Sequence, residues 1–186
     1  RTPAMSAAHA ALRSPAALAD FVRGEWQLSK TMTYVCGGIT STFTGTATFA
    51  PLELTELPGV LAYHEKGEVL IDGNTFHAHR RLLWDCARDP IAVYFDESQD
   101  RSPNVVWSAA RFFHPLPLSA AVIGSAENMP PTERSVAHVP FEHWCDPDSY
   151  VGELQVSSRE AFSLSWRISG PRKDGTIDSR YSRDRR

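Results

Sequence analysis

Hydrophobic and polar residues alternate with a period of two along most of the chain after Gly24. This is the pattern of β-strands that bury one face and expose the other. About ten such segments follow one another at short spacing, and no helices alternate with them. This arrangement excludes a parallel α/β sheet and predicts an antiparallel sandwich or barrel.

The residues before the first strand carry the signals of a short helix. Ser14 is a favourable N-cap, Pro15 suits the first helical position, and Gly24 lies just beyond the last helical residue. The chain is therefore expected to have three regions. These are an N-terminal extension with a short helix at 1–23, a barrel at 24–183 and a tail at 184–186.

Small residues interrupt the hydrophobic face of the second predicted strand. Gly45 and Ala47 alternate there with phenylalanines, while threonines occupy the opposite face. Small residues on an inward face suit a tightly curved barrel wall or a nearby ligand.

Three predicted strands place a cation among the hydrophobic residues of one face. These cations are Lys30, Arg80 and Arg111, and each lies in register with large apolar neighbours. An unpaired charge inside a barrel is costly, so each needs a carboxylate, carbonyl groups, trapped water or an anionic ligand. The pattern therefore indicates an interior that is not purely apolar.

The functional interpretation is a non-catalytic barrel that binds a small amphipathic anion. The candidate ligand contacts are Lys30, Arg80, Arg111, Trp84, His143 and Tyr150. One alternative is that the cations pair with Glu65, Asp148 or Asp174 instead. Another is a register one residue different, which would turn these side chains outward.

A second functional hypothesis is an accessory subunit of a larger, mitochondrial assembly. The first nineteen residues hold eight alanines and no acid, which is typical of a targeting presequence or its remnant, or of a flexible terminus. The stretch 115–134 is rich in proline and alanine without a clear period, so it is expected to be a long loop. The candidate surfaces for protein partners are therefore three segments: 1–23, 115–134 and the basic tail at 172–186.

Charge and composition argue against several classes of protein. The formal net charge is −3, which argues against nucleic-acid binding through bulk electrostatics. No apolar run has the length needed to span a bilayer. Three widely spaced cysteines and the absence of an N-x-S/T sequon predict an intracellular protein without a disulfide framework.

The Gly24-Glu25-Trp26 segment resembles the opening of lipocalins and fatty-acid-binding proteins. In that superfamily the tryptophan closes one end of the barrel, and a basic residue near the last strand packs over its ring. Arg180 or Arg183 would supply that residue here. The resemblance implies an all-β, up-and-down calycin-like barrel of about ten strands.

Two further motifs resemble an uncharacterised family of small β-barrel domains of this type. Segment 143–150 matches an H-x-C-x-P-D-x-Y signature, and segment 166–174 ends in a matching G-P-x-K-D signature. The resemblance covers about 24–183. The residues that carry it are Gly24, Trp26, Cys145, Pro147, Asp148, Trp166, Gly170, Lys173, Asp174 and Arg183.

The chain departs from that family at three places. Lys30 stands where an arginine is usual, Gly175 replaces an aromatic residue, and 115–134 looks expanded. The family carries no established activity, so the resemblance supports the predicted fold and adds little about the chemistry of the protein.

Segment 143–150 also carries the candidate reactive groups. His143 and Cys145, with His138 or His114, could ligate zinc or, through His143 alone, haem iron. His143, Cys145 and Asp148 could instead serve a hydrolase or isomerase. The favoured interpretation is structural: a turn at Pro147 and Asp148, with Cys145 packed and His143 hydrogen-bonded. No catalytic residue, metal or cofactor is therefore predicted.

Overall fold

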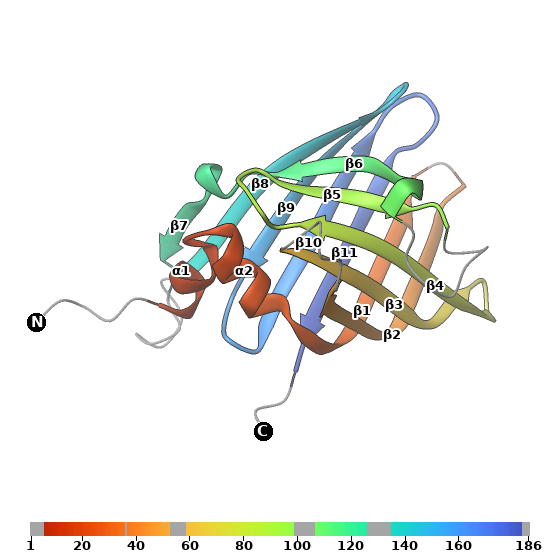
Figure 1. Cartoon of the computed structure of the whole chain (residues 1–186). Helices are drawn as coiled ribbons and strands as arrows, with labels where there is room; N and C mark the ends of the chain where they lie inside the picture. The colour runs from red at the N-terminus through yellow and green to blue at the C-terminus, as the bar shows by residue number, and fades with distance from the viewer. Residues whose placement is uncertain (1–5, 36, 53–58, 99–106, 126–134, 184–186) are drawn as a thin grey trace, which may run out of the picture.

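Eleven antiparallel strands of the described chain form one sheet in the order β6-β5-β4-β3-β2-β1-β11-β10-β9-β8-β7 (Figure 1). The computed structural model describes residues 6–35, 37–52, 59–98, 107–125 and 135–183. Ten strands make a nearly closed barrel, which confirms the predicted fold class, and β7 extends the sheet beyond β8. The strands are β1 Gly24–Tyr34, β2 Ile39–Pro51, β3 Val60–Ile71, β4 Asn74–Asp85, β5 Ile91–Asp96, β6 Ala110–Leu116, β7 Val122–Ser125, β8 Ser135–Cys145, β9 Asp148–Val156, β10 Ala161–Ser169 and β11 Gly175–Ser182.

Side chains, not a backbone ladder, close the seam between β6 and β8. The rings of Phe113 and His143 lie 4.9 Å apart between centroids, and those of His114 and Phe141 lie 4.6 Å apart. The His143 ring also makes a hydrogen bond to the backbone of Phe113. Strands β6 and β8 are therefore joined by aromatic packing.

Close backbone approach bends the wall between β2 and β3. Gly45 lies opposite Gly67 in the ladder. A Cβ atom on Gly45 would lie 2.2 Å from the carbonyl oxygen of Lys66, and one on Gly67 would lie 2.3 Å from that of Thr44. The small residue that the sequence placed on this inward face is therefore required by the curvature.

Two helices, α1 Ala7–Leu12 and α2 Pro15–Val22, cover one end of the barrel (Figure 1). Ser14 caps α2 as predicted, because its Oγ accepts the backbone N–H of Ala17 at 3.2 Å. The helix α1 was not predicted. Its alanine-rich sequence has little amphipathic signal, and it is stabilised by burying Ala8 and Leu12. At six and eight residues, neither helix is long enough to cross a membrane.

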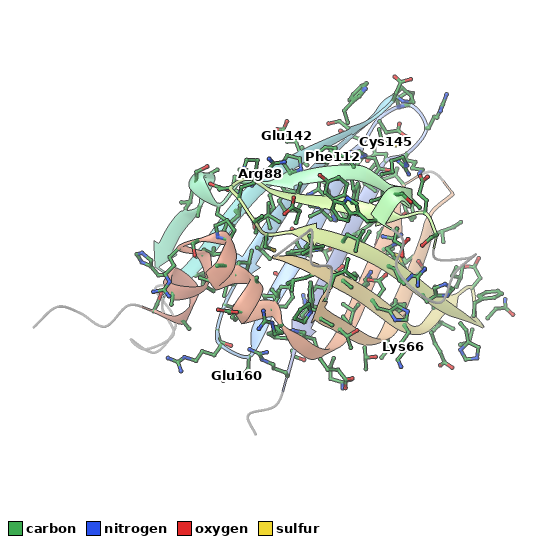
Figure 2. The ribbon with its side chains drawn as sticks, in the orientation of Figure 1. Lys66, Arg88, Phe112, Glu142, Cys145 and Glu160 are labelled. Atoms are coloured by element: carbon green, nitrogen blue, oxygen red, sulfur yellow. The ribbon has the colours of Figure 1, made fainter. Side chains whose placement is uncertain are left out.

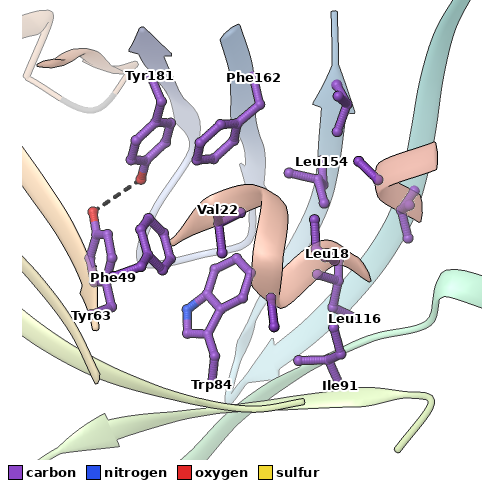
Figure 3. Close-up of a cluster of buried hydrophobic side chains, with 14 of the residues drawn as sticks. Leu18, Val22, Phe49, Tyr63, Trp84, Ile91, Leu116, Leu154, Phe162 and Tyr181 are labelled. Carbon is purple, nitrogen blue, oxygen red and sulfur yellow. Dashed lines mark hydrogen bonds between the residues drawn. The ribbon is translucent and has the colours of Figure 1, made fainter. Parts of the chain in front are cut away.

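Trp26 closes the barrel beneath α2. Its side chain is fully buried, and its Nε1 donates to the carbonyl oxygen of Val22 at 2.7 Å. Of the two basic residues predicted to cover its ring, Arg183 does so, with its guanidinium 4.1 Å from the ring centroid. Arg183 also donates to the carbonyl oxygens of Phe21 and Arg23. The buried cluster around this end is shown in Figure 3.

The structure corrects the predicted secondary structure at three places. Segment 115–134 is not one long loop. It completes β6, forms a 3₁₀ turn at Leu118–Ala120 and adds β7. Residues 126–134 of this segment lie outside the described ranges. The alternation around Arg111 predicts a strand that already includes Trp107, whereas β6 begins only at Ala110. Most of the 172–186 segment is β11, which lies between β1 and β10 rather than in a free tail. Residues 184–186 lie outside the described part of the chain.

Candidate functional site

A cavity of about 310 Å³ opens in the barrel at the end away from the helices. Cys145, which lines it, lies at this end in Figure 2, far from Glu160. Much of its wall is apolar and comes from strands on both sides of the barrel. Leu82 and Trp84 on β4 contribute to this wall with Phe113, Trp166 and Ile177 on β6, β10 and β11.

The structure brings all six predicted ligand contacts to this one cavity. Lys30, Arg80 and Arg111 line it together with Trp84, His143 and Tyr150. Their side chains face inward because each lies on the strand face that carries the buried hydrophobic residues. Their part in ligand binding stays a prediction.

An ion pair lies deep in the cavity. The Nζ atom of Lys30 lies 2.6 Å and 2.5 Å from the two carboxylate oxygens of Glu65, and both side chains are about nine-tenths buried. Burial lowers the pKa of Lys30, the charge of Glu65 opposes that shift, and Arg80 adds to it. The alternative of internal pairing is therefore realised for Lys30, with Glu65 as partner.

Two tyrosines extend this pair into a polar network. The Tyr63 hydroxyl donates to the Glu65 carboxylate, and it lies 3.0 Å from the Tyr181 hydroxyl. Because Tyr63 uses its one proton on Glu65, Tyr181 must be the donor to Tyr63. Burial is the largest cause that raises the pKa of both tyrosines. The network of Lys30, Glu65, Tyr63 and Tyr181 is called the floor network below.

The other cations lie nearer the solvent. Arg111 contacts Glu97 and lies over the Phe95 ring, with its side chain 61% exposed. Lys173 makes a hydrogen bond to the Tyr150 hydroxyl, which is the main cause that raises its pKa. Arg80 is exposed, and no carboxylate among the described residues forms an ion pair with it.

The two family signatures meet beside the mouth of the cavity. Asp148 is buried, and its Oδ1 accepts the backbone N–H groups of Arg172 at 3.0 Å and Lys173 at 3.3 Å. Pro147 lies in the turn between β8 and β9, as predicted, and the carbonyl oxygen of Asp174 accepts the N–H of Val35 at 2.9 Å. The signature residues therefore fix the β10–β11 turn, which carries Lys173 to the cavity.

We expect Gly170→Ala to destabilise the protein by about 1–3 kcal/mol. A Cβ atom at this position would lie 2.2 Å from Oδ1 and 2.7 Å from the Cα of Asp148, so backbone must move. Urea unfolding measures the change. Gly124→Ala is the control, because its Cβ would meet only the Val136 carbonyl oxygen at 3.8 Å. Equal stability of the two variants would contradict the packing argument.

The reactive groups of segment 143–150 do not assemble as a triad. His143 and Cys145 line the cavity, whereas Asp148 is engaged with the β10–β11 turn and is absent from the lining. Cys145 is exposed rather than packed, which corrects the structural interpretation at that residue. Cys145 is the last residue of β8 and lies opposite Asp148, the first residue of β9.

The other candidate histidines lie elsewhere. His114 is buried against Phe141 and Trp166, and burial lowers its pKa to about 4. His138 lies 3.1 Å from Glu153 on the neighbouring strand. Within the described ranges, no three residues of metal-binding type lie together.

Sequence reasoning missed three contributors to the cavity. Glu65 was considered only as a partner for a cation, Lys173 only as a motif residue, and Tyr63 not at all. Tyr63 and Glu65 could have been found, because they continue the alternation of β3 on its inward face. Lys173 lies in a turn, where no periodicity indicates direction.

Residues 22–183 match a family of unknown function, DUF6314. The chain belongs to this family. This membership confirms the resemblance found in the 143–150 and 166–174 motifs. A search of curated proteins finds no match.

A solved structure with a TM-score above 0.5 supports the fold. This DUF6314 member is similar to the S-type phycobiliprotein lyase CPES from Guillardia theta, with 7% identity and a TM-score of 0.54, over 98% of this chain and 99% of that chain. It is also similar to the redesigned β-barrel mFAP1 bound to DFHBI, with 15% identity and a TM-score of 0.33, over 89% and 97% of the two chains. At 7% identity the likeness to the lyase concerns the fold alone.

Proposed function

We propose that this DUF6314 protein is a binding barrel whose cavity takes a small amphipathic anion. The observation that carries the proposal is the composition of the cavity lining. An apolar wall is combined with four cations, Lys30, Arg80, Arg111 and Lys173, and one carboxylate, Glu65. An apolar pocket with a few convergent charged groups is the usual form of a small-molecule site.

Arg80 supports the anionic character of the ligand. Its guanidinium has no ion-pair partner among the described residues, and it is close enough to Lys30 to lower the pKa of that residue. Two neighbouring cations repel each other, and a bound anion relieves this repulsion. Guanidinium groups also bind carboxylates, sulfonates or phosphates with paired hydrogen bonds.

The test is titration with the anionic fluorescent probe 8-anilinonaphthalene-1-sulfonate. We expect saturable one-to-one binding that is reduced at least about tenfold by Ile177→Trp, because a larger ring at this lining position fills the cavity. Thr42→Trp on the exposed outer face of β2 is the control and should bind like the wild type. Non-saturable binding, or equal affinity in Ile177→Trp, would overturn the proposal.

A further inference from the structure

We infer that the ligand lies with its charged group at the mouth of the cavity and an uncharged end against the floor network. This inference rests on the proposed function and specifies the ligand class: an anion with its charge at one end of an apolar or aromatic body.

The charge of Lys30 is already neutralised. Both carboxylate oxygens of Glu65 contact its Nζ, and the side chains of Lys30 and Glu65 are only 11% and 8% exposed. A second anion at this depth would lie against the Glu65 carboxylate, with little water to screen the repulsion. The floor network is thus unfavourable for a charged group.

The inner part of the cavity offers uncharged hydrogen-bonding groups instead. Ser179 lines the cavity opposite Lys30 in the β1–β11 ladder. Trp84 also lines it, and its buried Nε1 has no acceptor among the described residues. A carbonyl or ether oxygen of a ligand could accept from such donors, whereas an unmade bond to a buried donor costs free energy.

The mouth has the opposite character. Arg80 is exposed and without a carboxylate partner in the described chain, and Lys173 is hydrogen-bonded to the hydroxyl of Tyr150 rather than to a carboxylate. Arg111 is partly satisfied by Glu97. Both Arg80 and Lys173 therefore have charge available for an anion, and solvent at the mouth reduces the cost of bringing that anion there.

The experiment compares two probes that share a ring system. 8-Anilinonaphthalene-1-sulfonate carries a negative charge, and N-phenyl-1-naphthylamine lacks it. We expect Arg80→Gln and Lys173→Gln each to weaken binding of the sulfonate probe by about tenfold, with little change for the neutral probe. Arg167→Gln removes an exposed charge from the outer face of β10 and is the matched control.

Variants of the floor network show whether the charged group of the ligand lies at the mouth or against the floor network. The double variant Lys30→Met/Glu65→Leu is expected to change both affinities by the same factor, so that the preference for the sulfonate probe is kept. Loss of that preference in the double variant, with no effect of the mouth variants, would overturn the inference but leave the proposed function standing. Failure of both probes to bind saturably would overturn the proposed function itself.

A salt titration of the wild type also tests, without any variant, whether the charged group of the ligand lies at the mouth. A charge held at the solvent-exposed mouth is screened, so the affinity of the sulfonate probe should fall several-fold between about 20 and about 500 mM NaCl. The neutral probe should not weaken. A sulfonate affinity that is insensitive to salt would contradict the charged group lying at the mouth.

Discussion

Glu65→Gln is expected to lower the free energy of unfolding by about 3–5 kcal/mol at pH 7, because it leaves a buried ammonium without its counter-charge. The substitution keeps the size of the side chain and a hydrogen-bond acceptor for Tyr63. It removes only the charge that faces Lys30, whose Nζ contacts both oxygens of the carboxylate. The nearby Arg80 makes the loss larger, since it already disfavours the charged form of Lys30.

The matched comparison is Lys30→Met/Glu65→Leu, which removes both charges together. Replacing a whole buried ion pair with apolar side chains of similar volume is often neutral or stabilising. We therefore expect the double variant to be more stable than Glu65→Gln, as measured by urea unfolding followed through tryptophan fluorescence. A Glu65→Gln variant within about 1 kcal/mol of the wild type would show that the pair is not buried in solution.

Stability is expected to fall as the pH is lowered from about 6.5 to about 4, with His114 as a main cause. Burial lowers the pKa of His114 from 6.5 to about 4, and the neighbouring His143 adds to that shift. Between these two values the unfolded chain binds a proton that the folded chain does not. The stabilisation is therefore complete above pH 6.5 and lost as the pH falls to 4, by about 3 kcal/mol in order of magnitude.

The measurement is the free energy of unfolding against pH for the wild type and His114→Phe. The phenyl ring keeps the contacts with Phe141 and Trp166 and cannot titrate. The wild-type curve should drop more steeply than the variant curve between pH 6.5 and 4. His77→Gln is the control, because its side chain is 93% exposed. Parallel curves for the wild type and His114→Phe would contradict a buried neutral imidazole.

Much of the barrel could be predicted because a β-strand has a strict period of two. The alternation around Lys30, Arg80 and Arg111 correctly placed all three on the inward face, and the same rule would have placed Glu65 there. Ser14, Pro15 and Gly24 likewise predicted α2, since capping depends on neighbouring residues only. The prediction of a long loop at 115–134 was wrong because the strand within it, Val122–Ser125, is too short to show a period.

Local sequence by itself therefore determined the fold class, the inward face of each long strand and the position of one helix. These are properties of dihedral preference and periodicity over a few residues. Only the tertiary structure decided which charges meet. It paired Lys30 with Glu65, 35 positions away, and left Arg80 without a carboxylate among the described residues. Such pairings depend on the register and curvature of the whole barrel, which no single segment encodes.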